Sequence, residues 1–264
     1  AIAREFKTCF YKDYHELAGK IDAASIVVPT IGHYALSRDL LKSNIHLLIE
    51  KPITADLAQA RRLEKLSRNR KLILQVGHVE RFNSALQAVE KICRHPRFIE
   101  CHRLGPFKDR GIEVGIVLDL MIHDLDIILE LVKDKVKKIE AVGVSVLTPY
   151  EDIANARITF QGGTVCNLTA SRITEKSMRK IRIFEKDTYI ALDYMTQEAQ
   201  IYKKIKNQII KKDVPIKKEE SLKAELKSFL NCIRANKKPL VCAGKAVEAL
   251  EIALKITRLC RSSG

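Results

Sequence analysis

The sequence predicts an α/β fold in two parts, a domain with a parallel sheet followed by an α+β domain with an open, largely antiparallel sheet. In the first part, short apolar runs alternate with amphipathic helical stretches, which is the pattern of a parallel sheet with crossover helices. In the second part, a nearly all-apolar helix precedes a series of strand-like runs with β-branched or alternating residues. Because the pattern changes near residues 77–83, we expect domains over residues 1–78 and 79–264.

The first domain is expected to consist of consecutive strand–helix–strand units. Strands are expected over residues 24–28, 46–49 and 72–76, and helices over residues 34–42 and 55–69. Thr54 can cap the second helix with its hydroxyl. Leu57, Ala60 and Leu66 then follow at helical spacing, so this face is expected to lie on the sheet.

The second domain is expected to begin with a helix and an extended segment, and to continue with a long buried helix and a sheet. Helices are expected over residues 84–94, 116–132, 221–236 and 244–260, and strands over residues 98–103, 139–147, 154–160, 164–170, 179–185 and 189–192. Gly162 and Gly163 separate two of these strands and indicate a hairpin.

Composition favours a folded cytoplasmic protein. Hydrophobic residues make up 46% of the chain, which is a globular value. The seven cysteines include no C-x-x-C pair, so reduced thiols are expected rather than a zinc site or a disulfide framework. The amino terminus does not resemble a signal peptide, and charged residues interrupt the longest apolar stretches. We therefore expect no membrane partner.

The net charge of +15 raises the question of an anionic partner. Much of the charge is expected in lysine-rich turns and on exposed helix faces, at Lys203, Lys204, Lys206, Lys211, Lys212, Lys217 and Lys218. No row of aromatic residues alternates with these lysines, and a basic stripe alone is only the first indication of nucleic-acid binding. A solvated surface is therefore favoured, and no nucleic-acid partner is expected.

The long helix of the second domain carries the most informative polar residues. Asp119, His123 and Asp126 fall at i, i+4 and i+7 in a segment that is otherwise almost entirely apolar. Buried carboxylates need partners, and a carboxylate one turn from a histidine forms a natural acid/base pair. The alternative is a core histidine next to an ion pair at the edge of the helix.

Polar loops follow each of the three expected parallel strands. Glu50, Lys51 and Pro52 come directly after the second strand, at the sheet edge where open α/β sheets bind their ligands. A lysine at that position can polarise a carbonyl or hydroxyl oxygen. The other two loops contribute Pro29, Thr30, His33, Gly77, His78, Arg81 and Asn83.

The order of these motifs resembles the glucose-fructose oxidoreductase and inositol dehydrogenase family, written Gfo/Idh/MocA. The motifs are V-P-T-x-x-H, E-K-P, V-G-H-x-x-R-F-N and G-x-x-x-D-x-x-x-H-D-x-D. The resemblance implies a Rossmann domain and an NAD(P)-dependent sugar dehydrogenase. It also implies that Lys51 lies between nicotinamide and substrate, with His123 as general base and Asp119 as its partner or as a substrate contact.

The same resemblance assigns the cofactor contacts, with NAD favoured over NADP. It places Pro29, Thr30, His33, Glu50, Lys51, His78 and Arg81 at the cofactor, and Gly77 and Asn83 at the hinge between the domains. The chain has no G-x-G-x-x-G motif, whose loop holds the pyrophosphate at a helix amino terminus. We therefore expect an incomplete Rossmann domain, in a fragment of an enzyme that starts about thirty to forty residues earlier.

The substrate is expected to be a nucleotide sugar. Several segments, including GHVERFN and HRLGPFKDRG, resemble family members that oxidise the 3-position of UDP-N-acetylglucosamine for lipid A synthesis. Cationic side chains suited to a diphosphate are expected at Arg103, Lys108, Arg110 and Arg172. The alternative is a free sugar or a polyol such as inositol, which needs no such cations.

Two other classes of protein compete with the dehydrogenase. A metal-dependent hydrolase or isomerase using Asp119, His123 and Asp126 needs a further ligand, and no H-x-H or H-x-x-x-H motif supplies it, so no metal is expected. A non-catalytic binding protein of the same fold is the second rival. Independently of the function, the open face of the second sheet is expected to form subunit contacts, so we expect a homo-oligomer, a dimer or a tetramer.

Overall fold

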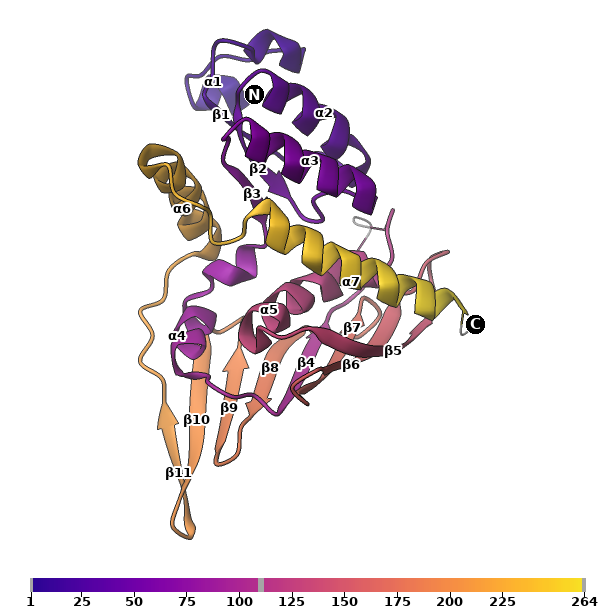
Figure 1. The fold of residues 1–264 in the computed structure, drawn as a ribbon, viewed down its shortest axis with the longest axis vertical. Helices are drawn as coiled ribbons and strands as arrows, with labels where there is room; N and C mark the ends of the chain where they lie inside the picture. The colour runs from indigo at the N-terminus through magenta and orange to yellow at the C-terminus, as the bar shows by residue number, and fades with distance from the viewer. Residues whose placement is uncertain (1, 109–111, 263–264) are drawn as a thin grey trace.

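The computed structural model describes residues 2–108 and 112–262, and it contains two sheets (Figure 1). The smaller sheet has three parallel strands in the order β1-β2-β3, namely β1 (Ala23–Ile26), β2 (His46–Glu50) and β3 (Leu74–Gly77). Two helices connect them, α2 (Thr30–Lys42) and α3 (Leu57–Asn69). The expected strand–helix–strand units are therefore confirmed.

Two local expectations for this domain were wrong. The helix expected over residues 34–42 already begins at Thr30, so Thr30 and His33 lie in the first turn of α2 rather than in a loop. The cap of α3 is Asp56, whose carboxylate accepts from the backbone amide of Gln59. Thr54 instead donates its hydroxyl to the carbonyl of Asp56, since the chain makes one further turn before the helix starts.

Short helices precede the first strand, where no element was expected. They are α1 (Ile2–Glu5) and the 3-10 helix η1 (Tyr14–Leu17). The second is fixed by reciprocal capping between Asp13 and Glu16. Local hydrogen bonds of this kind stabilise a single turn without the apolar periodicity on which a sequence-based prediction depends.

The larger sheet has eight strands in the order β11-β10-β9-β8-β4-β7-β6-β5. Its strands are β4 (Phe98–Leu104), β5 (Val136–Val144), β6 (Ile153–Phe160), β7 (Val165–Ser171), β8 (Met178–Phe184), β9 (Thr188–Asp193), β10 (Glu198–Ile205) and β11 (Gln208–Asp213). Only β4 and β7 pair in parallel, so the expected largely antiparallel sheet is confirmed. The expected hairpin also occurs, and Gly163 in its turn has φ +91°, a left-handed conformation that favours glycine.

The hairpin of β10 and β11 was missed, and it corrects the expected location of several lysines. Lys203 and Lys204 lie in β10, and Lys211 and Lys212 lie in β11, not in turns or on helices. Only Lys206 is at the turn. Lysines on an outer strand discourage pairing with another chain, which explains a charged sequence in an extended conformation.

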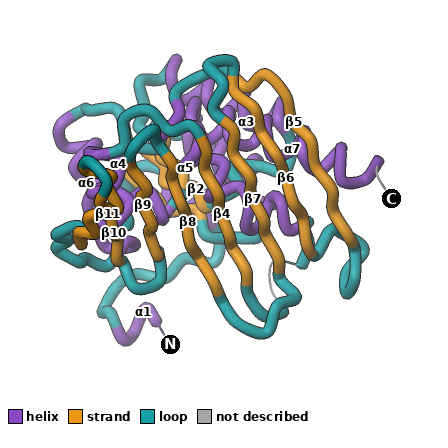
Figure 2. Tube along the Cα trace, turned by 90° about the horizontal axis from the view of Figure 1, so that it is seen from below, coloured by secondary structure: helices purple, strands orange, loops and turns teal. Residues whose placement is uncertain are grey.

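Helices cover one face of the large sheet and leave the other open. The helices of this part are η2 (Val79–Phe82), α4 (Ser84–Ile92), α5 (Ile122–Val132), α6 (Ser221–Ala235) and α7 (Ala243–Ser262), with a π-helical turn, η3 (Val117–Met121), directly before α5. Helices α5 and α7 lie behind the strands in Figure 2, and the face toward the viewer carries no helix.

The carboxyl-terminal segment returns to the parallel sheet. Phe229 of α6 packs with Leu48 of β2 and Ile73, and the backbone amide of Val76 donates to the carbonyl of Val241. In Figure 1, α7 then runs between the two sheets. The carboxyl-terminal segment thus packs against the parallel sheet as well as the large sheet. At this interface, the ends of β2 and β3 face the segment formed by η3 and α5.

Among the described residues, no helix is both long enough and apolar enough to span a bilayer.

Candidate active site

Lys51 connects the two domains at the carboxyl end of β2. It follows the strand directly, and its peptide bond to Pro52 is cis. Its ammonium donates to the backbone carbonyl of Asp119 and to the carboxylate of Asp119, with 3.0 Å between Nζ and Oδ1. These two residues are 68 positions apart, and Lys51 is the hydrogen-bond partner of Asp119 here, whereas the resemblance implied His123 or the substrate as its partner.

Asp119 lies in the π-helical turn rather than in regular α-helix. Such a turn inserts an extra residue, and π-turns occur frequently at functional sites. The second carboxylate oxygen of Asp119 is 4.0 Å from a terminal nitrogen of Arg172, which itself donates to the carbonyl of Val114. Asp119 is thus placed between two cations, Lys51 and Arg172.

His123 is almost buried, with 8% of its surface exposed. Its Nδ1 has no hydrogen-bond partner among the described residues. Burial and then the charge of Lys51 hold the pKa of His123 well below its ordinary value. The ring is therefore neutral near pH 7, which is the form that accepts a proton.

The expected cofactor edge is formed by the ends of the three parallel strands. After β1, Val27 and Ile31 are strongly exposed beside Pro29 and Thr30. His33 is buried below them, and its two ring nitrogens lie 2.9 Å from the carbonyl oxygens of Val28 and Pro52. His33 thus ties the loop after β1 to the loop that carries Lys51.

Glu50 and Gly77 complete this edge. A Cβ atom on Gly77 would meet the Glu50 side chain at 3.2 Å, a contact tighter than almost all those that real Cβ atoms make. The backbone of β3 can therefore approach Glu50 only because residue 77 is glycine. His78, the next residue, is buried, and its ring meets that of His123 edge to face with centroids 5.8 Å apart.

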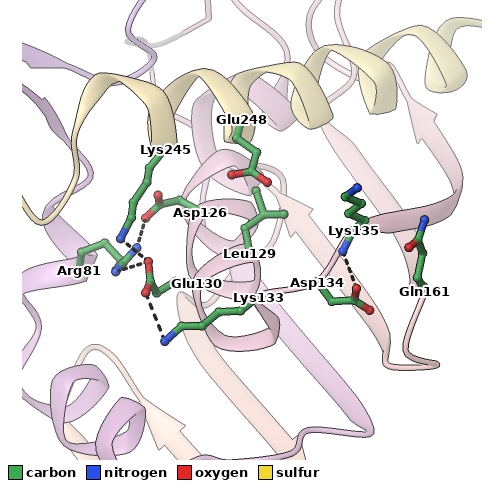
Figure 3. Close-up of a pocket in the computed structure, with 10 residues that line it drawn as sticks. All are labelled: Arg81, Asp126, Leu129, Glu130, Lys133, Asp134, Lys135, Gln161, Lys245 and Glu248. Carbon is green, nitrogen blue, oxygen red and sulfur yellow. Dashed lines mark hydrogen bonds and ion pairs between the residues drawn. The ribbon is translucent and has the colours of Figure 1, made fainter. Parts of the chain in front are cut away.

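Arg81 does not reach the cofactor edge in this structure. Its guanidinium is 1% exposed and pairs with Glu90 at 3.3 Å, Asp126 at 3.4 Å and Glu130 at 3.1 Å. Figure 3 shows Arg81 with Asp126 and Glu130, and Lys245 of α7 also pairs with Glu130. The expected cofactor contact is thus replaced by a structural role, because three carboxylates from α4 and α5 already occupy the guanidinium. Asn83, expected at the hinge, caps α4 with its side chain.

A cavity of about 330 Å³ opens beside Asp119. It is lined by Arg103, Leu104, Gly105, Pro106, Lys108, Asp119, Leu120, Arg172, Ser177 and Arg179. Three of the four cations expected at the substrate are among them, whereas Arg110 lies outside the described residues. Ser177 and Arg179 were missed, since neither stands in a recognisable motif and only the pairing of β8 with β4 brings them to this wall.

Arg103 lines this cavity, and three of its five N–H groups already have partners. Its Nε and one terminal nitrogen donate to Asp124 at 3.0 and 2.8 Å, and the other terminal nitrogen donates to Glu80 at 2.8 Å. Although burial opposes it, Asp124 and Glu80 raise the pKa of Arg103. These two carboxylates hold the guanidinium in place, and its contact with a phosphate stays a prediction.

Within residues 2–108 and 112–262, no three histidine, cysteine, aspartate or glutamate side chains gather in a way that could hold a metal ion. The remaining arrangement is a lysine at a parallel strand end that contacts an aspartate, one helical turn from a neutral histidine, and the aspartate lines a cavity with several cations. Such an arrangement, at the edge where a Rossmann sheet binds dinucleotides, defines a two-domain oxidoreductase that moves a proton to or from an alcohol or carbonyl.

Comparison with known proteins agrees with this class. Residues 1–78 match the family described as "Oxidoreductase family, NAD-binding Rossmann fold", and residues 86–189 match "GFO/IDH/MocA C-terminal domain". UDP-N-acetylglucosamine 3-dehydrogenase of Acidithiobacillus ferrooxidans is 34% identical over 97% of this chain and 84% of its own length. A solved structure of that enzyme superposes with a TM-score of 0.94 and covers 99% of this chain and 86% of the other.

A more distant relative acts on a polyol. The scyllo-inositol 2-dehydrogenase (NAD(+)) of Bacillus subtilis is 26% identical over 92% of this chain and 76% of its own length. Together these matches show that the chain belongs to the GFO/IDH/MocA oxidoreductase family, as its motifs predict. Its cofactor domain is of the NAD-binding Rossmann type, and the enzyme is a sugar dehydrogenase.

Proposed function

We propose that this enzyme oxidises the 3-hydroxyl of UDP-N-acetylglucosamine with NAD. The observation that carries the proposal is the juxtaposition of Lys51, Asp119 and a neutral His123 beside a cavity with further cations. The 34% identical relative from A. ferrooxidans, which bears that activity in its name, supports the choice of substrate.

The proton steps follow from the pKa and the contacts of these residues. His123 Nε2 takes the hydroxyl proton, since His123 is neutral and its other ring nitrogen is buried. Lys51 donates to the developing oxyanion, and Asp119 orients the ammonium for this purpose. Bound NAD supplies the hydride acceptor. Removing water from the closed cavity strengthens each of these charge interactions.

The described residues fit the nicotinamide half of the cofactor. The exposed apolar side chains of Val27 and Ile31 provide a surface for a planar ring, next to Pro29 and Thr30 at the start of α2. Glu50 and Lys51 would hold the adjoining ribose and nicotinamide, and His33 would fix both loops. The chain contains no G-x-G-x-x-G motif, so these residues account for only part of a dinucleotide site.

The cavity supports a nucleotide sugar better than a free polyol. Lys108, Arg172 and Arg179 bring three cations to a cavity that also contains Asp119. Phosphate oxygens suit such cations, whereas a neutral polyol gains little from them. We assign the diphosphate to Lys108 and Arg179, because the side chain of Arg179 is 49% exposed although it pairs with Glu80, whereas that of Arg172 is only 6% exposed.

The remaining proposals concern the cellular compartment, the oligomeric state and the fate of the product. We place it in the cytoplasm, which the seven free cysteines support. The open face of the large sheet favours a homodimer or a tetramer. A 3-keto product is an acceptor for an amino group, as in the synthesis of amino sugars for lipid A.

The test is turnover by the full-length gene product, including any sequence that precedes Ala1. NADH absorbance is followed with UDP-N-acetylglucosamine and, separately, with inositol. The proposal predicts turnover of the nucleotide sugar that is abolished in Lys51→Met and His123→Asn. Turnover of inositol alone would assign the polyol instead, and a protein that binds no NAD would overturn the dehydrogenase.

A further inference from the structure

Two buried imidazoles, those of His78 and His123, meet next to the proposed reaction centre, and three of their four ring nitrogens lack hydrogen-bond partners within residues 2–108 and 112–262. These are both nitrogens of His78, which is 1% exposed, and Nδ1 of His123. Buried polar atoms without partners are uncommon, and each such atom in a native fold needs an explanation. Here the two rings that carry these atoms meet edge to face, with centroids 5.8 Å apart.

The charges around the two rings differ. The groups that act on His123 are all cationic or neutral, and they come from four elements: Lys51, Arg103, Arg179 and His78. The groups that act on His78 include an anion as well as cations: Asp126, Lys51 and Arg81. A positive charge is therefore less unfavourable on the ring of His78 than on the ring of His123.

The pKa directions agree with this difference. Burial and then Lys51 hold the pKa of His123 well below its ordinary value. Burial also lowers the pKa of His78, but the charge of Asp126 opposes that shift. A proton on His123 is thus poorly held, and its neighbour holds one better.

Resting on the proposed dehydrogenase function, we propose that His78 relays the substrate proton away from His123, with Asp126 as its counter-charge. As the substrate O–H bond breaks, the N–H bond forms at Nε2 of His123, and the proton on its Nδ1 passes to a nitrogen of His78. The spacing of the rings fits transfer through one bridging water molecule, which is not consumed. Only a proton moves in this step, and the hydride leaves separately.

Asp126, at the end of the relay opposite the substrate, lies at a second cavity. This cavity, of about 610 Å³, is lined by Asp126 together with Arg81, Glu130 and Lys245 (Figure 3), and none of these residues lines the substrate cavity. Arg81 pairs with Asp126 at 3.4 Å. The relay therefore leads from the substrate cavity, through His123, His78 and Asp126, to a second opening in the surface. A proton could leave there while the substrate still closes the first.

The order of protonation can be measured without any turnover. In NMR spectra of the full-length protein with ¹⁵N-labelled histidine, the two rings are assigned with His78→Phe and His123→Phe. We expect His78 to take its proton at higher pH than His123, and Asp126→Asn to lower the pKa of His78. The reverse order of protonation would overturn the relay. Because this experiment needs no substrate, its failure is distinct from a failure of the proposed function.

Kinetics test the transfer itself. His78→Phe keeps a ring of similar size but removes both nitrogens, so kcat is expected to fall by about 10- to 100-fold with an almost unchanged KM. In His78→Ala, added imidazole is expected to restore part of kcat in proportion to its concentration. The control is His102→Phe, on the open sheet face, which leaves kcat unchanged. An unchanged kcat in His78→Phe, or no rescue by imidazole, would contradict the relay.

Discussion

Two charged cavities flank helix α5, and they differ in how their charges are satisfied. On the Arg81 side, Glu130 pairs with Arg81 at 3.1 Å and with Lys245 at 2.5 Å. On the Asp119 side, Nδ1 of the buried His123 has no hydrogen-bond partner among the described residues. The larger cavity is therefore lined by ion pairs, whereas a neutral base lies one helical turn from Asp119 at the smaller one.

The presence or absence of hydrogen-bond partners distinguishes a structural cavity from a reaction site better than the volume or the charge of the cavity does. Both cavities are lined by lysine, arginine and acidic residues, and the larger is the less promising reaction site. A paired buried charge stabilises an arrangement once it has formed, and loss of one partner is costly. A buried polar atom without a partner is retained at a cost to stability, which indicates a role in function.

The largest expected effect is on the rate, at Lys51. Lys51→Met keeps the length of the side chain but removes its charge, so the developing oxyanion loses its donor. We expect kcat to fall by about 10³-fold, with little change in melting temperature. Lys133→Met, on the rim of the other cavity, is the matched control and should keep full activity. A Lys51→Met variant with full activity would contradict the claim that the reaction takes place at the cavity beside Asp119.

The reverse pattern is expected at Arg81. Arg81→Met leaves Glu90, Asp126 and Glu130 without their shared cation in a buried position. The free energy of unfolding should fall by about 3–5 kcal/mol, as measured by urea denaturation. If stability is retained but NAD no longer binds, Arg81 is a cofactor contact after all, as the sequence indicated.

A buried acid outside both cavities gives a pH-dependent prediction. Burial and then the charge of Glu50 raise the pKa of Glu225 from 4.5 to about 8. Because the folded state favours the neutral carboxyl, the stability from Glu225 is complete below pH 4.5 and is lost as pH rises through about 8.

Glu225→Gln tests this prediction, since the amide is neutral at every pH. At about pH 9 the variant should be more stable than the wild type by about 2–3 kcal/mol, and at about pH 4 the two should be equal. Urea denaturation across this range is the measurement. A stability difference that does not vary with pH would show that Glu225 titrates normally.

A smaller effect is expected at the substrate cavity. Lys108→Ala and Arg179→Ala should each raise KM for UDP-N-acetylglucosamine by about tenfold, with kcat nearly constant, because one phosphate contact is lost. The corresponding change at Lys211, on the distant hairpin, serves as the control. A fall in kcat without any change in KM would place these cations at the reacting atoms instead.

The smallest effect is expected at Lys245. Its ion pair with Glu130 is partly exposed, since 37% of the lysine side chain is accessible. Lys245→Ala should therefore lower the free energy of unfolding by at most about 1 kcal/mol and leave kcat unchanged. A loss as large as that expected for Arg81→Met would mean that the network acts as a single unit.

The sequence predicted what depends on local pattern. Apolar runs and helical spacing located β2, α3 and the segment of α5, and the motifs around Lys51 and His123 indicated the reaction centre. It did not predict β10 and β11, because consecutive lysines in both strands, Lys203 and Lys204 and then Lys211 and Lys212, interrupt the alternation of apolar and polar residues. Extended structure there comes from pairing with β9, which is a tertiary effect.

What the sequence missed at the site has the same origin. Arginine at positions 81 and 103 was assigned to ligands, yet both guanidinium groups are buried against carboxylates from other elements. Arg179 was missed because its place at the cavity follows from strand order, which sequence spacing does not reveal. The sequence therefore predicted that cationic side chains gather at this site, but not which carboxylate or ligand each of them contacts.

The most direct test of the account is the fate of the hydrogen on the sugar carbon. The full-length protein is incubated with NAD and with UDP-N-acetylglucosamine that carries deuterium at carbon 3, and the reduced cofactor is examined by mass spectrometry. The account predicts one deuterium in the NADH, and none when His123→Asn is used. NADH without deuterium from the active enzyme would contradict oxidation at that carbon.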